Sequence, residues 1–205
     1  GVTAIGLNPL HPLYPNNPGH ISPYSPTSRC FLNTLYIDVT SVANFADCQD
    51  VQALVNSDDF KKHVADVNSK DYIDYPYAAH LKFQALELLY KDFISNHLAK
   101  NSEFADQYNA FLEEMGDDLF ELATFDALYE HFRKLDENAY GWKAWPVEFQ
   151  DPHSDAVEQF KKDNVERIGY FQFLQFVADK QLGDAAAQAK AHNMPIGLYL
   201  DLAVG

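Results

Sequence analysis

The chain has 205 residues, of which 47% are hydrophobic and 14% aromatic, and its formal net charge is −15 at pH 7. This length and composition indicate a folded protein with one large core or two small ones, and not a disordered chain. The excess of carboxylates argues against nucleic acid and against an anionic membrane surface as partners. No segment approaches the ~20 apolar residues needed to cross a bilayer. A neutral substrate is compatible with such a surface.

The two cysteines, Cys30 and Cys48, lack the CxxC spacing of redox and zinc motifs. They favour ordinary buried thiols in a reducing compartment, which we expect to be the cytoplasm. The chain begins GVTAIGLNPL, without an initiator Met or signal peptide, and stops in the strand-like run GLYLDLAVG. Because domain ends usually lie in polar, exposed segments, we expect an internal fragment of a longer protein.

The chain opens with a short apolar run at residues 2–7, which predicts a strand buried on both faces. Six of the ten prolines then fall within the first 26 residues. Such density forbids a helix and predicts an ordered, extended loop. Residues 32–39 follow as a possible second extended segment.

The middle of the chain is helical in character. Apolar residues recur at spacings of three and four, as in Leu81, Ala85 and Leu88. Helices are predicted at residues 49–56, 57–67, 76–99, 102–114 and 124–135. A linker rich in Gly, Pro and aromatic residues follows at 138–153, then a helical stretch at 154–192 with a break at Gly183-Asp184, and a last apolar strand at 194–204.

This order predicts a βαβ unit whose connection carries a large helical insertion. We divide the chain into residues 1–40, with the first strand and its loop, 41–150, the helical insertion, and 151–205, the crossover helix and second strand. By residue count the fold is predominantly α.

Asp201 is the first candidate for a functional role, because it ends an otherwise apolar strand, where an unpaired buried carboxylate is costly. In a (β/α) barrel, a polar residue at this end of a strand lies at the mouth that holds active sites. A structural carboxylate that accepts backbone hydrogen bonds explains the position equally well. His11 follows the first strand and would emerge at the same mouth, although a packed structural histidine is the favoured interpretation.

Tyr24 lies in Ser22-Pro23-Tyr24-Ser25-Pro26, where the prolines lower the entropic cost of holding its ring in place. A fixed aromatic face among hydroxyls suits a neutral sugar ring, with Ser22 as a weaker contributor. Spacing alone slightly favours a tyrosine that packs the loop onto the core. Trp142 and Trp145 could also offer sugar-stacking faces, but a hydrophobic hinge is favoured.

Several chemistries lack their motifs. The sequence contains no HExxH, GxxxxGK[ST], GxSxG or post-strand GxGxxG, and no histidines at the i, i+4 spacing of a helical metal pair. No metal or cofactor is called for. The acidic pairs, such as Asp58-Asp59, are interpreted as solvated helix faces.

Three stretches resemble the bacterial 4-alpha-glucanotransferases, the amylomaltase or disproportionating-enzyme family (glycoside hydrolase family 77). SPYSPTSRCFLNTLYIDV is similar to the family's loop SPYSPSSRRFLNPLYIDV, and NPLHPLYP to the strand and turn before it. RIGYFQFLQFVADKQL and AKAHNMPIGLYLDLAVG are similar to the helix and strand that come later. The resemblance covers most of the first and last 40 residues.

The resemblance implies part of a (β/α)8 TIM barrel, from strand 2 to strand 3, with a helical insertion between them. It implies transfer of α-1,4-glucan segments between maltodextrins by a retaining double displacement, without a cofactor. Maltooligosaccharides would be the partners. Self-association through exposed strand edges is also expected.

By the same resemblance, Tyr24 matches the tyrosine that stacks on the sugar beside the scissile bond, and Asp201 matches an aspartate that shapes that subsite. Both would bind substrate, with His11 and Ser22 as weaker candidates. The nucleophile and general acid lie on later strands, so no catalytic residue is expected here, and Asp38, Asp155 and Asp201 do not take their place. The fragment alone is therefore expected to be inactive.

The chain departs from the family pattern at Thr34, Cys30 and Leu200, where Pro, Arg and Arg are common. The change at Leu200 puts a contact near Asp201 in doubt. Two alternatives remain. Another α-amylase-type glycosidase or phosphorylase usually carries an Asn-His pair after the aspartate, where this chain has Leu202-Ala203. A non-catalytic helical interaction module leaves the strand-terminal aspartate unexplained.

Overall fold

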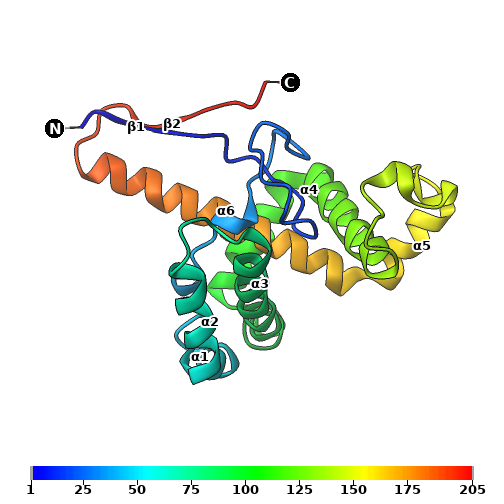
Figure 1. The fold of residues 1–205 in the computed structure, drawn as a ribbon, viewed down its shortest axis with the longest axis horizontal. Helices are drawn as coiled ribbons and strands as arrows, with labels where there is room; N and C mark the ends of the chain where they lie inside the picture. Colours follow the sequence, from blue (N-terminus) through cyan, green and yellow to red (C-terminus); the bar gives the residue numbers. More distant parts are fainter. Residues whose placement is uncertain (1, 205) are drawn as a thin grey trace.

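A computed structural model describes residues 2–204. Strands β1 (Ala4–Leu7) and β2 (Gly197–Leu200) lie side by side along one edge of the molecule (Figure 1). They pair in parallel, with Ala4 opposite Gly197 and Leu7 opposite Leu200. The predicted parallel βαβ connection is thus confirmed, although both strands are shorter than the apolar runs that predicted them.

Six α-helices make up most of the connection between the strands: α1 (Gln49–Asn56), α2 (Asp58–Asn68), α3 (Tyr75–Asp92), α4 (Glu103–Leu135), α5 (Asp155–Asp163) and α6 (Val165–Ala191). The long α6 runs beneath the strands, α3 descends from its middle, and α1 and α2 pack at the far end of α3 (Figure 1). None of the helices in residues 2–204 is long and apolar enough to cross a membrane.

Side-chain caps explain where several helices begin. The hydroxyls of Ser57, Ser102 and Ser154 each accept a hydrogen bond from the backbone N–H three residues later. The carboxylate of Asp74 does the same for α3, whose first turn also contains Pro76. Such caps satisfy N–H groups that would otherwise lack partners in the first turn.

Of the two predicted helix breaks, one was too long and the other was wrong. The expected gap at 115–123 is reduced to a kink within α4 at Gly116, whose φ of 56° and ψ of −143° are non-helical and suit a residue without a Cβ. The expected break at Gly183-Asp184 does not occur, since α6 runs through it. The chain breaks instead at Asn164, between α5 and α6.

The segment at 32–39 is not extended as predicted. It forms two short 3₁₀ turns, η1 (Thr34–Tyr36) and η2 (Val39–Ser41). The side chain of Asn33 accepts from the Leu35 N–H at 3.0 Å, and the side chain of Asp38 accepts from the Thr40 N–H at 3.0 Å. These two caps override the β-propensity of the apolar residues between them.

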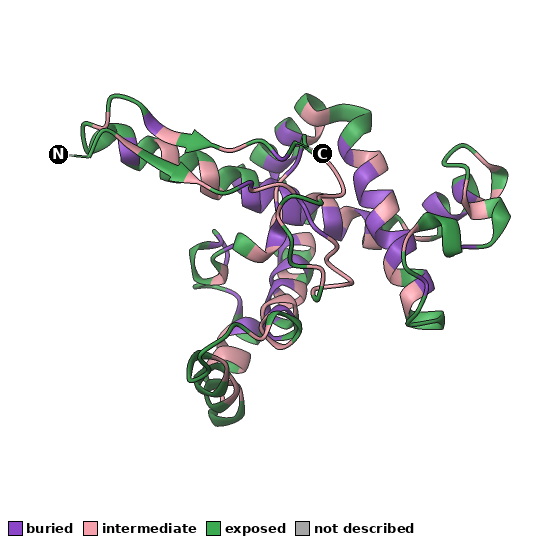
Figure 2. Ribbon diagram, turned by 45° about the horizontal axis from the view of Figure 1, so that its top comes forward, coloured by how far each residue is buried: buried purple, intermediate pink, exposed green. Residues whose placement is uncertain are grey.

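The core lies where α3, α4 and α6 meet, which is the purple centre of Figure 2. It is rich in aromatic rings, with Phe93 at its middle. The Phe93 ring lies 4.9 Å from that of Phe173 on α6 and 5.1 Å from that of Phe104 on α4. Edge and tilted contacts of this kind add to the free energy gained by burying the rings.

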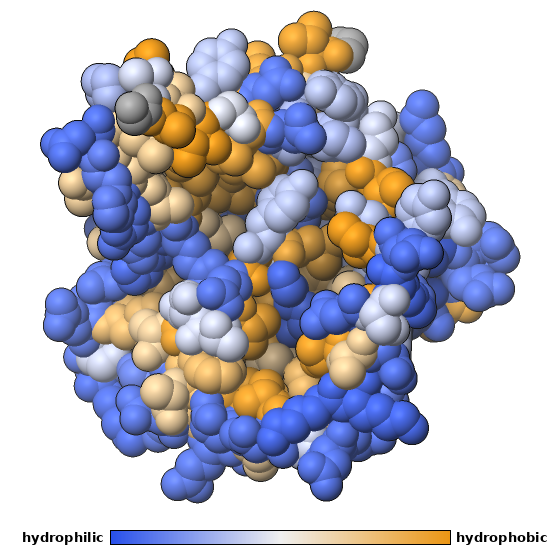
Figure 3. All heavy atoms as spheres, turned by 60° about the vertical axis from the view of Figure 1, so that its left-hand side comes forward, coloured by the Kyte–Doolittle hydropathy of each residue, from blue (hydrophilic) through white to orange (hydrophobic). Residues whose placement is uncertain are grey.

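The strands are not buried on both faces as predicted. Ile5, Tyr199 and Leu200 are 41%, 66% and 52% exposed. Figure 3 shows exposed apolar side chains on the face of the molecule that includes the strands. Within the described residues the sheet has only these two strands, so little besides α6 covers it. The cysteines are both unpaired as expected, but only Cys48 is buried, because Cys30 lies on the exposed loop.

Candidate functional site

The fold brings Tyr24 and Asp201 together from positions 177 residues apart. The Tyr24 hydroxyl donates a hydrogen bond to Asp201 Oδ2 at 3.4 Å, which is long for such a bond. Tyr24 is 52% exposed, so its ring remains accessible beside the carboxylate. Asp201 directly follows β2, and its N–H donates to the carbonyl of Leu7, the last residue of β1. The pair therefore lies at the carboxyl ends of both strands.

Hydrogen bonds within the proline-rich loop hold it together on both sides of Tyr24. The N–H and the hydroxyl of Thr27 both donate to the carbonyl of Pro12, at 2.9 and 3.2 Å. Within the loop, Nε2 of His20 lies 3.0 Å from the Ser25 carbonyl and donates to it. These bonds hold the backbone on both sides of Tyr24, as the sequence predicted of an ordered loop.

Arg29 joins the same loop to the segment after β2. Its Nε donates to the carbonyl of Ala203 at 2.5 Å. The loop thus contacts the second strand's extension at two points, through Tyr24 and through Arg29. This places a guanidinium close to the Asp201 end of the site.

The weaker candidates do not join this pair. Ser22 is exposed, and only its carbonyl is engaged, by the N–H of Ser25. The Nε2 of His11 is buried without a hydrogen-bond partner among the described residues, so it is bonded to neither Tyr24 nor Asp201. Such an orphaned buried nitrogen is uncommon.

The two tryptophans behave differently. Trp145 is buried at 4% exposure and stacks on Phe132 with ring centroids 5.3 Å apart, as a hydrophobic hinge requires. Trp142 is 46% exposed and carries the Lys143 ammonium over its ring at 5.4 Å. Only Trp142 could offer a face to a ligand.

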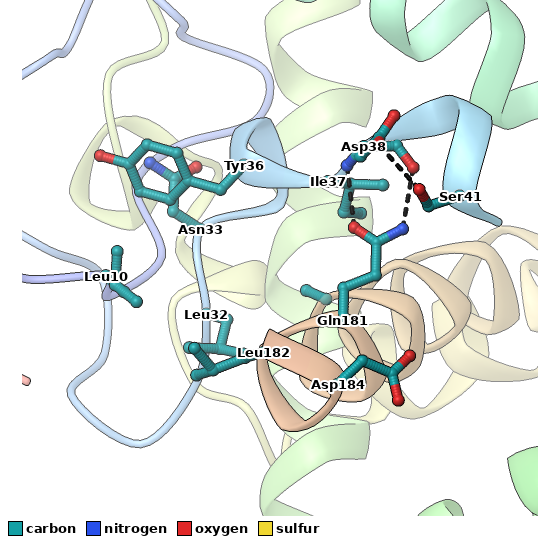
Figure 4. Close-up of a pocket in the computed structure, with 11 residues that line it drawn as sticks. Leu10, Leu32, Asn33, Tyr36, Ile37, Asp38, Ser41, Gln181, Leu182 and Asp184 are labelled. Atoms are coloured by element: carbon teal, nitrogen blue, oxygen red, sulfur yellow. Dashed lines mark hydrogen bonds between the residues drawn. The ribbon is translucent and has the colours of Figure 1, made fainter. Parts of the chain in front are cut away.

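Three hollows of similar size surround the body. One of about 410 Å³ lies between the 32–41 segment and α6 (Figure 4). A second, apolar one of about 490 Å³ lies among α1, α2 and α3. A third of about 560 Å³ lies between the proline-rich loop and α4, with Tyr14 and Trp142 on its walls. Neither Tyr24 nor Asp201 lines any of them, so the pair forms an open, solvent-facing surface.

Tyr24 and Asp201 together offer groups that can bind a ligand. An open aromatic ring can stack on the CH face of a sugar, and a carboxylate can accept hydrogen bonds from its hydroxyls. A retaining glycosyl transfer also needs a nucleophile and an acid about 5–5.5 Å apart. Asp38 caps η2 and accepts from the hydroxyls of Thr40 and Ser41, which lower its pKa. Asp155 lies in the first turn of α5. Both have structural positions.

No group of three potential metal ligands comes together within residues 2–204. Sequence reasoning missed Arg29 and His20 as residues that hold the loop. A single arginine in a loop of small and proline residues was the available signal for Arg29. For His20 no signal existed, because its partner is a backbone carbonyl.

Known proteins match this chain over its whole length. The family model described as 4-alpha-glucanotransferase matches residues 1–205. The chain is 32% identical over 207 residues to the 4-alpha-glucanotransferase of Haemophilus influenzae, covering 100% of this chain and 30% of that protein. Against the 4-alpha-glucanotransferase of Mycobacterium bovis, identity is 30%, over 100% of this chain and 27% of that protein.

The fold is also that of a solved structure. The crystal structure of amylomaltase from Corynebacterium glutamicum superposes with a TM-score of 0.71 at 24% identity, covering 100% of this chain and 25% of that one. This chain spans less than a third of the length of each of these three proteins. Since the family model extends from its first residue to its last, the chain belongs to the 4-alpha-glucanotransferase family.

Proposed function

We propose that this chain supplies part of the sugar-binding surface of a 4-alpha-glucanotransferase that moves α-1,4-glucan segments between maltodextrins. Membership of the family supports the reaction class. The assignment of this sugar-binding surface rests on the hydrogen bond between Tyr24 and Asp201 at the ends of two parallel strands. Tyr24 stacks on the glucose ring next to the scissile bond, and Asp201 accepts from its hydroxyls. His11 and Ser22 remain weaker candidates for substrate contacts.

We assign the two strands to a (β/α)8 barrel, as its second and third strands, with residues 41–150 as an insertion between them. The parallel pairing, with α6 leading into β2, supports this assignment. Site residues at the carboxyl ends of the strands fit the side of a barrel where active sites lie.

The test is disproportionation of maltotriose by the full-length protein. Replacing Tyr24 by Ala removes the stacking face, and we expect kcat/KM to fall roughly tenfold to a hundredfold, equivalent to about 1.4–2.8 kcal/mol of transition-state stabilisation. Asp201→Asn should weaken substrate binding in the same assay, since an amide replaces one acceptor oxygen by a donor.

Tyr72 provides a matched control, because it is 88% exposed and lies between α2 and α3, away from the strands. Tyr72→Ala should leave kcat/KM within twofold of the parent protein. Equal activity for Tyr24→Ala and Tyr72→Ala would show that the Tyr24 ring takes no part in glucan binding.

The isolated 205-residue chain should not disproportionate maltotriose, because the resemblance implies that the nucleophile and the general acid lie on later strands of the barrel. We place the protein in the cytoplasm and expect the isolated chain to self-associate through the free edges of β1 and β2. Sedimentation velocity of the isolated chain over a tenfold concentration range checks the second point. A monomer throughout would contradict it.

A further inference from the structure

Two glutamines of α6 hold the loop segment that follows Tyr24. The side-chain amide of Gln175 accepts from the Leu32 N–H at 3.0 Å and donates to the Leu32 carbonyl at 2.8 Å. Gln181 repeats the pattern on Asp38, accepting from its N–H at 2.8 Å and donating to its carbonyl at 2.8 Å. The second of these amide clamps is visible in Figure 4. The two glutamines are six positions apart in the sequence, and so are the two residues that they hold.

An amide is well suited to this task, since it presents an acceptor oxygen and a donor nitrogen side by side, which match the N–H and the C=O of one residue. Each clamp binds both backbone groups of one loop residue, and among the described residues only the Asp38 carbonyl has a further partner, the Ser41 N–H of η2 at 3.2 Å. Gln175 is 4% exposed, so an unclamped amide there would be buried without partners. Gln181 is half-buried, so its clamp can be removed at a lower cost to folding.

The first clamp connects α6 to the candidate site by a short path. Leu32 is three residues beyond Arg29, which binds the carbonyl of Ala203, and Phe31 between them is buried in the core. On the far side of Arg29, Thr27 is tied to Pro12. The backbone between Tyr24 and Leu32 therefore has little freedom to shift while Gln175 holds its end.

We propose that Gln175, with Gln181 behind it, is a positioning residue that sets the place of the Tyr24 ring relative to Asp201. Neither glutamine touches the pair itself, so each acts through the loop backbone. Because α6 leads into β2, the same helix fixes both halves of the site. The inference rests on the function proposed above, in which Tyr24 stacks on the substrate.

The test uses the full-length protein with Gln175→Met and Gln181→Met, which keep side-chain length but remove both hydrogen bonds. Gln188→Met is the matched control, because Gln188 is an exposed glutamine of the same helix. Misplacing a binding group by about 1 Å can cost a hundredfold in rate, so we expect Gln175→Met to lower kcat/KM for maltotriose roughly tenfold to a hundredfold. Gln181→Met should have a smaller effect, and Gln188→Met less than twofold.

A double-mutant cycle with Tyr24→Ala separates positioning from general damage. If Gln175 acts through the ring, adding Gln175→Met to Tyr24→Ala should lower kcat/KM by less than twofold further. Full multiplication of the two effects would overturn the proposal. The same cycle with Gln181→Met gives the answer if Gln175→Met does not fold.

Hydrogen exchange measured by mass spectrometry gives a readout that does not depend on activity. We expect peptides covering residues 20–38 to exchange faster in both clamp variants, and peptides from α3 to be unchanged. Unchanged exchange at residues 20–38 would show that the two glutamines do not restrain the loop. If exchange rises but Tyr24→Ala leaves the rate intact, the clamp exists while the proposed role of Tyr24 fails, and with it the positioning of a substrate contact.

Discussion

Gly169 on α6 lies against a tyrosine that leaves no room for a side chain. A Cβ at this position would lie 2.5 Å from the hydroxyl oxygen of Tyr90, on α3. Tyr90 is 6% exposed, its ring lies 5.4 Å from that of Phe173, and its hydroxyl donates to the Glu166 carbonyl at 2.9 Å. The ring is therefore pinned by packing and by a hydrogen bond, and it cannot swing away without loss.

Gly169→Ala sets two effects against each other. In a helix interior, Ala is favoured over Gly by about 1 kcal/mol. Here the added methyl must displace Tyr90, and overpacking of a core costs typically 1–3 kcal/mol, with about 1 kcal/mol more if the Tyr90 hydrogen bond breaks. Because the displaced hydroxyl loses its bond to Glu166, we expect the variant to be less stable by roughly 1–3 kcal/mol, which for a chain of this length lowers Tm by about 2–12 °C.

Two comparisons isolate the cause. Gly183 lies on the same helix, and nothing lies within 4 Å of its ideal Cβ, so Gly183→Ala should raise the free energy of unfolding by about 1 kcal/mol. In a Tyr90→Phe background the nearest remaining atom to a Cβ at 169 is 3.7 Å away, an ordinary contact. Gly169→Ala should then be neutral or stabilising. Thermal melting of the four variants tests this, and an equal loss with Phe at 90 would refute the reasoning.

Three further predictions concern single residues. Thr34 is buried and its hydroxyl has no partner among the described residues, so Thr34→Val should raise stability in thermal melts by about 1–2 kcal/mol. Burial, and then the Glu130 carboxylate, raise the pKa of Asp126 well above its ordinary value, so the folded chain keeps this proton after the unfolded chain has lost it, and stability falls as pH rises from about 4. Relative to the parent protein, Asp126→Asn should therefore gain free energy of unfolding as pH rises from 4.5 to 7, by at most about 1.4 kcal/mol per pH unit. A difference in Tm between the two proteins that stays constant over this pH range would contradict this. Gly116→Ala should lower the midpoint of urea unfolding by the equivalent of roughly 1–3 kcal/mol, because its φ of 56° is strained for a residue with a Cβ.

Local patterns in the sequence were sufficient to predict the two parallel strands and the starts of several helices. The apolar runs at both ends predicted two parallel strands, and the resemblance then placed Tyr24 and Asp201 in one subsite. Helix starts could be located because serine and aspartate caps are local signals. The site could be anticipated to the extent that it depends on strand ends, whose place in a parallel unit follows from topology.

The failures share a cause, which is competition from contacts that a local pattern does not contain. Residues 32–39 have an apolar, strand-like composition, yet Asn33 and Asp38 turn their own backbone into 3₁₀ turns. The strands were expected to be buried, but burial depends on neighbours and not on the strand's own residues. The clamps made by Gln175 and Gln181 join positions 143 residues apart, and a glutamine in a helix gives no sign of its partner.

The parallel pairing of Ala4 with Gly197 has a consequence for the order of folding. Contacts between such distant positions carry a large loop-closure entropy, so they form late unless the intervening chain is already compact. Packing of α3, α4 and α6 shortens the effective distance, and the strands and the Tyr24–Asp201 pair can close only afterwards. If Tyr24 and Asp201 bind a glucan as proposed, that glucan would bind only the closed chain and stabilise it by mass action. The affinity for sugar and the stability of the distant helical core would then be thermodynamically linked.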